Sequence, residues 1–361
     1  MTAQKWLITG GAGFFGAHMC RYLIERGETV IAYDIETFLE YEKPAGVIEV
    51  KGDIRDQATL DKALEGVNYV VHAAAALALA DPAEINAVNA EGTRLVLEAA
   101  ARAGVKRVVH IGTCAIYGMP SEHPLFETTP LDPMGTYGIA KAKAEEYMAN
   151  AAGVETVRIR PKSFIGTGRL GIFQILFDWI EHGAMIPIFG NGENLFQLLD
   201  VRDLCEGVYL AMMKGRNKEV YLIAADRFGT VNSDVGALLD HAASGAGMLR
   251  LPAKPLKMMC ATLDAVKLSP VYRWVYDTAD QDSFVSIDKA KAELGFQPKY
   301  SNQDTLIETY DWYLREGKAL AAKATGTSHR TAWRQGVLAP AKAVLAIGRA
   351  GRQAKQRAKM K

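Results

Sequence analysis

The stretch TGGAGFFG, residues 9–16, decides the fold. It spaces Gly10, Gly13 and Gly16 as G-x-x-G-x-x-G directly after the apolar segment WLIT (6–9). Glycines in such a turn let the backbone approach a pyrophosphate, and the N-terminus of the following helix faces the negative charge. The stretch therefore predicts a strand, a glycine turn and a helix that together bind a dinucleotide.

A carboxylate in the next strand supports this interpretation. Asp34 ends the strand TVIAYD (29–34), eighteen residues after Gly16, where a carboxylate can hold ribose hydroxyls. It would repel a 2′-phosphate, so NAD is favoured and NADP is the alternative cofactor. Asp34 could instead be an ordinary surface residue at a strand end. In KGDIRD (51–56), Asp53 and Ile54 are expected beside the adenine.

The rest of the N-terminal half alternates apolar strands with helical segments. A helix around 18–27 ends at Gly27, and further predicted strands are GVIEVKGD (46–53), NYVVHAAA (68–75), RVVHIGT (107–113) and ETVRIRP (155–161). Strands rich in Val and Ile between amphipathic helices indicate an α/β fold, a Rossmann-type doubly wound parallel sheet. We expect this domain at 1–165, with later segments returning to it, a smaller substrate-covering region at 166–317, and a basic linker and amphipathic tail at 318–361.

Composition indicates a soluble globular protein, with 361 residues of which 49% are hydrophobic and 23% charged. The sequence shows no signal peptide and no apolar run long enough to span a bilayer, so we expect a cytoplasmic location. The cysteines lack metal-ligand spacing and are interpreted as reduced thiols, with no metal site expected: Cys20, Cys114, Cys205 and Cys260.

Charge is distributed unevenly along the chain. From Gly317 to Lys361 there are eleven Lys or Arg and no Asp or Glu, so the remainder carries a net charge of about −10. Within this segment, GVLAPAKAVLAIGRAGRQAKQRAKMK (336–361) places Leu338, Ala341, Val344 and Leu345 on one helical face. A cationic amphipathic helix can lie on an anionic membrane. A disordered solubilising tail is the alternative, and nucleic acid is the least favoured partner because no nucleic-acid-binding fold accompanies the tail.

Eight features in one order resemble the extended short-chain dehydrogenase/reductase family, in its NAD-dependent epimerase/dehydratase group. The resemblance covers roughly residues 5–320 and implies an NAD-dependent enzyme, commonly a homodimer. The matching features are TGGAGFFG, Asp34, GDIRD, VVHAAA (70–75), NAEGT (89–93), HIGTCAIYG (110–118), YGIAK (137–141) and RIRP (158–161). Carried onto this chain, the cofactor residues are Gly10, Gly13, Phe14, Phe15, Gly16, Asp34, Asp53, Ile54, Ala73, Ala74, Lys141, Pro161 and Ser163.

The resemblance assigns the chemistry to Tyr137, Lys141 and Thr113. Tyr137 would be the general acid/base, although a tyrosine ordinarily titrates at about pH 10. Lys141, one helical turn on, would stabilise the phenolate and lower that pKa, and it could also bind the nicotinamide ribose. Thr113 would donate a hydrogen bond to the same substrate oxygen, and its alternative role is to cap a strand.

Three nearby polar residues are given mainly structural roles. Cys114 has nothing in the sequence that would activate it and is expected to pack. His72 is expected to end a core strand, with a helper role near the cofactor as the alternative. Asn89 is expected to fix a turn or a helix contact rather than to touch substrate.

The substrate is argued from departures from the family pattern. The segment TCAIY (113–117) lacks the Asp–Glu pair that family dehydratases generally carry, which disfavours dehydration. In RPKSFIGTG (160–168), Lys162 and Ser163 stand where nucleotide-sugar epimerases usually have an Asn. Phe196 stands where those epimerases have a diphosphate-binding arginine, although Arg169 or Lys162 could compensate. The tentative substrate residues are Thr113, Tyr137, Arg169 and Phe196.

Two apolar stretches take the place of those polar features. RLGIFQILFDWIEHG (169–183) is a predicted apolar helix, and PLKMMCATLDAVKLSPVYRWVY (255–276) is rich in Met and aromatic residues. The second resembles the hydrophobic insertions of 3β-hydroxysteroid dehydrogenase-like members, which act on membrane lipids. Both stretches could instead be core or a dimer interface.

The favoured hypothesis is an NAD(P)-dependent oxidoreductase that interconverts a secondary alcohol and a ketone on a hydrophobic, lipid-like substrate of sterol or 3-oxo sphingolipid type. The first alternative is a nucleotide-sugar 4-epimerase that retains tightly bound NAD. The second is a non-catalytic cofactor-binding scaffold, against which the intact Thr113, Tyr137 and Lys141 argue.

Overall fold

The computed structural model describes residues 3–40, 42–78, 80–168, 171, 173–265 and 273–323, together with positions 342, 345, 346, 348, 351 and 353. The chain divides into two compact units, which are treated separately below. The first comprises Met1–Phe164, Val201–Ala224 and Val285–Lys299, and the second comprises Ile165–Asp200, Ala225–Phe284 and Tyr300–Lys361.

The first unit is built on a parallel sheet whose described strands follow the order β10-β6-β5-β4-β1-β2-β3. Because β1 lies between β2 and β4, the winding of the chain reverses there, and ligands of open parallel sheets bind outside the carboxyl ends of the strands at such a point. The predicted Rossmann-type fold is confirmed. The strands are β1 (Lys5–Thr9), β2 (Thr29–Asp34), β3 (Ile48–Lys51), β4 (Tyr69–His72), β5 (Arg107–Ile111), β6 (Glu155–Pro161) and β10 (Val220–Ile223).

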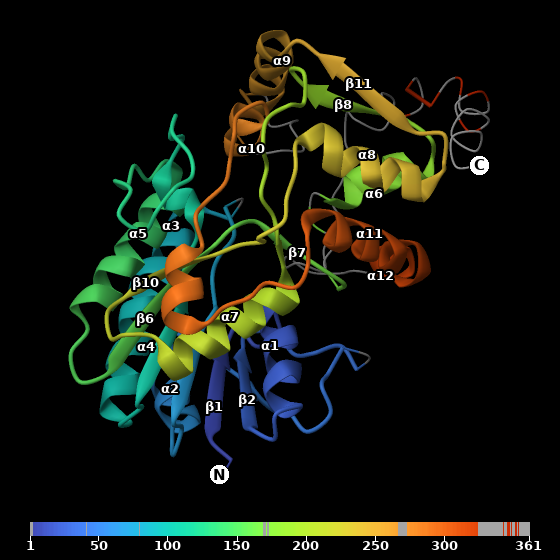
Figure 1. Ribbon diagram of the computed structural model, residues 1–361. Coiled ribbons are helices and arrows are strands. Elements are labelled where there is room, and N and C mark those ends of the chain that lie inside the picture. Colours follow the sequence, from blue (N-terminus) through green and yellow to red (C-terminus); the bar gives the residue numbers. More distant parts are fainter. Residues whose placement is uncertain are drawn as a thin grey trace. The chain divides into compact units, whose positions relative to one another are not determined.

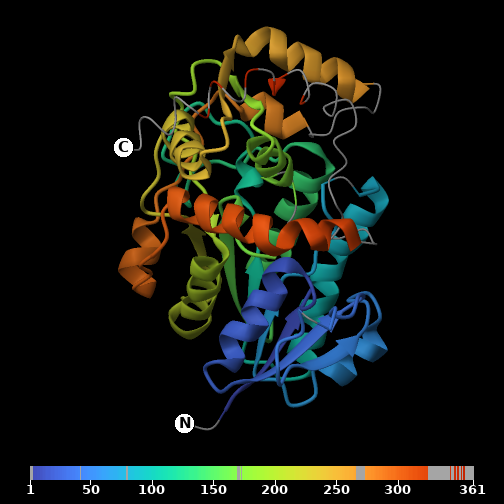
Figure 2. The same ribbon diagram turned by 90° about the vertical axis from the view of Figure 1, so that its right-hand side faces the viewer.

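Helices cover both faces of this sheet (Figure 1). One face carries α1 (Phe14–Ile24) and α7 (Val201–Lys214), which contact each other. The other carries α2 (Gln57–Ala63), α4 (Gly92–Arg102) and α5 (Gly135–Asn150), with α4 in contact with both neighbours. In the turned view of Figure 2, α1 lies directly against the N-terminal strands. Shorter elements are α3 (Pro82–Ile85), π-helical turns at Asn86–Glu91 and Ala290–Leu294, and a 3₁₀ turn at Cys114–Tyr117.

The strands are almost wholly apolar because both faces of the sheet are covered. Leu7, Val70 and Val108, from three neighbouring strands, are buried in one cluster with Val96 and Ala100 of α4. These two α4 residues are four apart and share a helix face, so the helix presents an apolar stripe to the sheet. This core holds the carboxyl ends of the strands in place.

The second unit combines a small parallel sheet with helices around its own apolar core. Strand β8 (Met185–Phe189) pairs with β11 (Gly247–Leu251). The core draws on α6 (Phe173–Glu181), α8 (Val231–Ala242) and α11 (Asn302–Trp312), whose residues Phe177, Leu238 and Tyr310 are buried in one cluster. The remaining elements are β7 (Phe164–Ile165), β9 (Leu199–Asp200), α9 (Ala253–Ala265), α10 (Arg273–Thr278), a π-helical turn at Tyr313–Gly317 and α12 (Lys318–Lys323).

The C-terminal segment differs from the expected linker at its start. Residues 318–323 are helical and continue from the turn after α11, as the alanines and lysines of KALAAK favour. Most of the predicted amphipathic stretch 336–361, including Leu338, Ala341 and Val344, lies outside the described residues. Leu345 is described, and it packs against the core of the second unit.

Across the helices of the described ranges, none is both long enough and apolar enough to cross a membrane.

Candidate active site

The glycine turn between β1 and α1 leaves no room for side chains. Gly10 has a φ of +69°, and a Cβ there would lie 2.9 Å from the backbone nitrogen of Ala74. A Cβ on Gly16 would lie 2.1 Å from the carbonyl oxygen of Gly10. Gly13 is the N-cap of α1 and has no side chain to cap it, so the first amides of the helix face outward. This is the arrangement in which a helix N-terminus binds a phosphate group.

Asp34 lies beside this turn at the end of β2. Its carboxylate accepts hydrogen bonds from the backbone N–H of Ala12 and of Glu36, both at 3.0 Å. Asp34 is therefore oriented by the turn itself, in contrast to a free surface carboxylate. Phe14 and Phe15 are buried, and both rings contact Phe164. Their contact with the cofactor stays a prediction.

Asp53 and Ile54 follow β3 and have other partners in the structure. Asp53 pairs with Arg55, whose Nη2 lies 2.6 Å from Oδ2, and this hydrogen bond holds the pKa of Asp53 below its usual value. Arg55 also pairs with Glu84 at 2.8 Å. The Ile54 side chain is buried against Gly92, where an added Cβ would lie 2.5 Å from its Cδ1. The adenine contact expected of both residues stays a prediction.

Tyr137 and Lys141 lie one turn apart on α5. Lys141 is only 3% exposed, and its Nζ donates a 2.8 Å hydrogen bond to the carbonyl oxygen of Ile111 at the end of β5. Burial lowers the pKa of Lys141 to about 8, against the opposing effect of Glu145. Tyr137 is half-buried and packs against the small cluster that contains Ala140. The ammonium group is thus fixed at the carboxyl edge of the sheet.

Thr113 and Cys114 follow β5 at the same edge. Thr113 caps the 3₁₀ turn, and its Oγ1 accepts a 3.1 Å hydrogen bond from the N–H of Ala115. The thiol of Cys114 donates to the carbonyl oxygen of Arg160 at 3.5 Å, and burial raises its pKa to about 11. Cys114 is therefore a protonated packing residue at neutral pH, and a thiolate nucleophile is disfavoured.

A buried ion pair behind this edge was missed by the sequence analysis. Arg160 of β6 and Glu145 of α5 are 4% and 3% exposed, and three hydrogen bonds of 2.7 to 3.1 Å join them. Burial alone would lower the pKa of Arg160, but Glu145 outweighs it and the pKa is raised. The guanidinium also donates to Tyr117 Oη at 2.6 Å, and Tyr117 donates to the carbonyl oxygen of Phe126 at 2.9 Å.

One signal in the sequence could have revealed this pair. Glu145 follows Lys141 by four residues on α5, so a helix that turns Lys141 inward also turns Glu145 inward. A carboxylate on a buried face requires a partner of opposite charge.

The residues after β6 complete this edge. Pro161 pairs in register with Ile223 of β10, and the N–H of Lys162 donates to the carbonyl oxygen of Ile223 at 3.0 Å. Lys162 is buried, and burial lowers its pKa to about 8, with Cys114 opposing. Ser163 is exposed. The structure thus brings Thr113, Lys141 and Pro161 to the carboxyl ends of neighbouring strands.

The two remaining candidate substrate residues lie elsewhere. Phe196 belongs to the second unit, where its ring packs against the apolar core and its carbonyl oxygen accepts a 2.6 Å hydrogen bond from Asn302. Arg169 lies outside the described residues. Their contact with a substrate stays a prediction.

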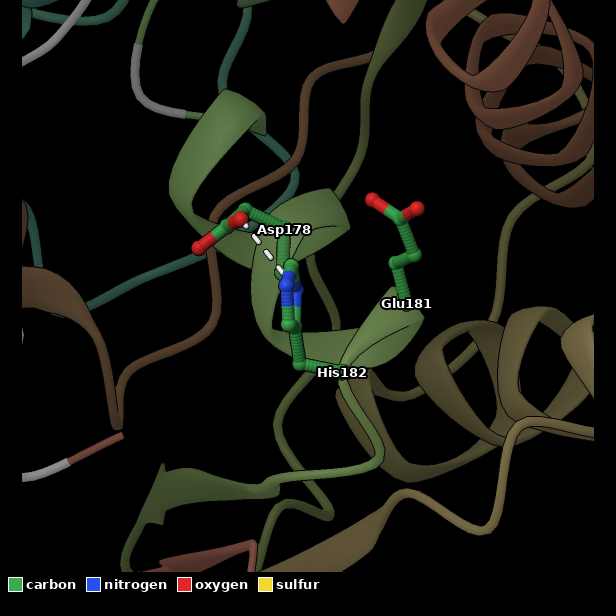
Figure 3. A group of neighbouring side chains, drawn as sticks. All are labelled: Asp178, Glu181 and His182. Carbon is green, nitrogen blue, oxygen red and sulfur yellow. Dashed lines mark hydrogen bonds and ion pairs between the residues drawn. The ribbon is translucent and has the colours of Figure 1, made fainter. Parts of the chain in front are cut away.

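A cluster with metal-ligand chemistry lies at the C-terminal end of α6, where none was expected from the sequence. It consists of Asp178 and Glu181 of α6 and of His182, the residue directly after this helix. Figure 3 shows the contact between Asp178 and His182, whose Oδ1 and Nδ1 atoms lie 3.3 Å apart. Both carboxylates already have cationic partners, because Glu181 pairs with Lys318 and Asp178 pairs with Lys342 at 2.8 Å. In this structure the cluster anchors lysines of the C-terminal segment.

The comparisons agree with this geometry. Residues 6–224 match the model of the NAD dependent epimerase/dehydratase family, and the chain belongs to that family. It is 30% identical over 341 residues to a dTDP-glucose 4,6-dehydratase of Streptomyces niveus, covering 88% of this chain and 94% of that protein. It is 28% identical to the 4-hydroxy-2-methyl-3-oxo-4-farnesyl-3,4-dihydroquinoline-1-oxide ketoreductase of Stigmatella aurantiaca, covering 84% and 95%. The solved structure of epimerase Mth375 from Methanothermobacter thermautotrophicus superposes with a TM-score of 0.74 at 25% identity, covering 88% and 94%.

The family result confirms the resemblance to the extended short-chain dehydrogenases/reductases. This chain is an NAD-dependent enzyme of the oxidoreductase type that the family comprises, and NAD is the cofactor that the sequence analysis expected. The likeness to 3β-hydroxysteroid dehydrogenases has no support among these relatives. The family contains dehydratases, epimerases and ketoreductases, so the substrate must be argued from this chain's own residues.

Proposed function

We propose that this enzyme interconverts a secondary alcohol and a ketone on a hydrophobic substrate, with Tyr137 as the general acid/base. The observation that carries the proposal is the buried Lys141, fixed on the Ile111 carbonyl one turn after Tyr137. A buried ammonium group on Lys141 favours the charged phenolate form of Tyr137 and so lowers the pKa of that tyrosine. The glycine turn and Asp34 fit NAD, because they offer uncapped helix amides to the pyrophosphate and an oriented carboxylate to the ribose.

The residues divide the reaction among them. When bound, the cofactor would supply a hydride to the substrate carbon as NADH, or accept one from it as NAD+. In the reductive direction the Tyr137 hydroxyl gives its proton to the carbonyl oxygen, which becomes the alcohol, and Lys141 stabilises the phenolate left behind. Thr113 donates a hydrogen bond to the same oxygen and orients it. In the oxidative direction the phenolate takes the proton back.

Dehydration is disfavoured by the two residues that come directly after Thr113. Cys114 and Ala115 occupy the two positions where family dehydratases generally carry Asp and Glu, and neither can remove a proton from carbon at neutral pH. The buried thiol of Cys114 is held protonated, since its pKa is raised to about 11. The 30% sequence identity to a dTDP-glucose 4,6-dehydratase therefore supports shared NAD chemistry more than it supports elimination of water.

A hydrophobic substrate, of sterol or 3-oxo sphingolipid type, is supported by two observations. In the second unit, α9 exposes Met258 and Met259, and its described side chains include none that is buried. The ketoreductase relative is named for a ketone that carries a farnesyl group, which is apolar. The nucleotide-sugar 4-epimerase stays the second candidate, favoured by the fold likeness to epimerase Mth375.

Net cofactor turnover distinguishes the two candidates. The purified protein is mixed with NADH and either long-chain ketones or UDP- and dTDP-sugars, and absorbance and products are followed. We expect oxidation of NADH in proportion to ketone reduced. Epimerised nucleotide sugar with no net change in NADH would overturn the proposal and establish the epimerase.

A peripheral contact with anionic membranes through 337–361, at the cytoplasmic face, remains a further proposal. Against it, two described residues of this segment already have partners in the second unit, where Lys342 pairs with Asp178 and Leu345 packs on the core. Deletion of 337–361 should abolish co-sedimentation with anionic liposomes and leave NAD binding unchanged. A homodimer also remains a proposal, to be checked by light scattering.

A further inference from the structure

A chain of buried hydrogen bonds runs beneath the glycine turn. Thr9 and His72 end the neighbouring strands β1 and β4 in register, and both are fully buried. Thr9 Oγ1 lies 2.8 Å from His72 Nδ1, and His72 Nε2 lies 3.0 Å from Thr93 Oγ1 on α4. Thr93 in turn donates to the carbonyl oxygen of Asn89 at 2.7 Å. The chain links two strands, a helix and the π-helical turn before that helix.

The direction of every bond in this chain follows from counting protons. The single hydroxyl proton of Thr93 goes to Asn89, so Thr93 must accept a proton from His72 Nε2. Burial lowers the pKa of His72 to about 3, and nearby Lys141 adds to this, so the ring is neutral and its Nδ1 carries no proton. Nδ1 therefore accepts the hydroxyl proton of Thr9. The lone pairs of Thr9 Oγ1 remain for other donors.

Those lone pairs hold the segment that follows β4. The N–H groups of Ala73 and Ala74 donate to Thr9 Oγ1 at 3.1 and 3.2 Å. Two residues on, the side-chain amide of Asn89 bonds both the N–H and the carbonyl oxygen of Ala76, at 2.8 and 3.0 Å. The backbone of Ala73 and Ala74 is thereby pressed against Gly10, where even a Cβ would not fit.

We propose that His72 is a positioning residue of the dinucleotide site, because it aims the Thr9 hydroxyl that fixes the Ala73–Ala74 backbone against the glycine turn. The ring does not touch the cofactor itself. It sets the spacing between the glycine turn after β1 and the segment after β4. These two loops lie where the winding of the sheet reverses, and a dinucleotide binds between such loops. The proposal rests on the NAD dependence of the family and is independent of the substrate.

The fold supplies a matched control for this role. His110 stands opposite His72 in the register of β4 and β5, and its ring centroid lies 5.1 Å from that of His72. It is equally buried, yet neither of its ring nitrogens has a hydrogen-bond partner among the described residues. Replacing His110 by Phe removes an imidazole at the same level of the sheet without breaking any hydrogen bond in the series that runs from Thr9 to Asn89.

The test compares His72→Phe with His110→Phe in the full-length protein. NAD is titrated without substrate, followed by quenching of protein fluorescence, and kcat and KM for NAD are then measured separately. We expect His72→Phe to weaken NAD binding about tenfold, as leaving buried partners unsatisfied would do, with kcat at saturating NAD little changed. His110→Phe should bind NAD within about twofold of the wild type.

A second pair of variants keeps the proposal testable if His72→Phe does not fold. Thr9→Ser retains the hydroxyl and should bind NAD like the wild type, whereas Thr9→Val should reproduce the loss. His72→Phe and Thr9→Val combined should be no worse than either alone, because both break one chain. Unchanged NAD affinity in His72→Phe, or equal losses in Thr9→Ser and Thr9→Val, would overturn the proposal. The NAD titration uses no substrate, so its failure is separate from failure of the alcohol–ketone assignment.

Discussion

Two helices of similar length, α5 and α9, are held in opposite ways. In the first unit, α5 turns Lys141 and Glu145 inward, where a backbone carbonyl and a buried arginine hold them. In the second unit, α9 has no buried residue between 253 and 263, and Met258 and Met259 are 71% and 52% exposed. The described polar anchor of α9 is Lys257, which bonds Asp280 at 2.5 Å and the carbonyl oxygen of Asp277 at 2.6 Å.

The difference separates chemistry from recognition. Proton transfer needs groups held within a fraction of an ångström, and buried ion pairs with several hydrogen bonds can fix a helix that well. An exposed helix whose described polar anchor is a single lysine is fixed less tightly, so its position can change more easily. The contacts of α5 therefore match the precision that the proposed proton transfer needs, whereas the exposed α9 leaves the proposed substrate open.

The largest expected effect on activity comes from removing the hydroxyl group of Tyr137 on α5. Tyr137→Phe should lower kcat by roughly 10³-fold, because the proton donor is lost while the ring keeps its packing. Steady-state turnover of NADH with a ketone substrate measures it. NAD affinity without substrate should be unchanged.

Tyr147 on the same helix provides the control. Its hydroxyl donates to Glu91 at 2.9 Å on the surface, away from Lys141's carbonyl partner. Tyr147→Phe should keep wild-type kcat. Equal losses in the two variants would mean that α5 tolerates no Tyr-to-Phe change, and the acid/base assignment would fall.

The second prediction concerns stability and tests whether the buried ion pair between Glu145 and Arg160 anchors α5. Glu145→Gln leaves Arg160 buried without its counter-charge, so the free energy of unfolding of the first unit should fall by about 3 kcal/mol. Glu146→Gln is the matched control, because Glu146 is exposed and pairs with Lys143 at 2.7 Å on the surface. That change should cost less than about 0.5 kcal/mol. Urea unfolding measures both, and similar losses would contradict the anchoring role.

Structural features that depend on the spacing of nearby residues were predictable from the sequence. Contacts between residues far apart in the sequence were not. The turn around Gly10 and Gly16 is encoded by backbone requirements that only glycine meets. The spacing of Glu145 after Lys141 could signal a buried carboxylate, but it does not identify the partner, because Arg160 lies fifteen residues further on in a strand.

The same limit applies to burial and exposure. Whether a Lys such as Lys162 is buried depends on neighbouring strands. The stretch that contains Met258 and Met259 is interpreted from the sequence as a hydrophobic insertion, with core or a dimer interface as alternatives, because exposure depends on what packs over a helix. These positions therefore needed the three-dimensional structure.

The third prediction concerns pH and again depends on how deeply α5 is buried. The pKa of Lys141 falls from its usual 10.5 to about 8, so the ammonium is lost as pH rises above about 8. The phenolate of Tyr137 then loses its stabilising charge, and kcat/KM should decline above that pH. A profile that stays flat to pH 10 would contradict the role of Lys141.

The stability of the fold should move in the opposite direction. Between pH 8 and 10.5 the unfolded chain still binds the proton that folded Lys141 has released. Stability rises with pH wherever the unfolded state binds more protons, so the contribution of this lysine should increase across that window. Urea midpoints at several pH values, compared with those of Lys141→Met, isolate it.

The smallest effect is expected on α9. Changing Met258 and Met259 together to Ser should alter the free energy of unfolding by less than about 0.5 kcal/mol, since both side chains are already largely in water. Met148 of α5 is the contrasting position, because it is fully buried, and Met148→Ser should cost about 2 to 5 kcal/mol. If α9 contacts a hydrophobic substrate, the double variant should raise KM for a long-chain ketone and leave kcat and NAD affinity unchanged. A loss of stability comparable to that of Met148→Ser would mean that α9 is held by its methionines, and the contrast between the two helices would disappear.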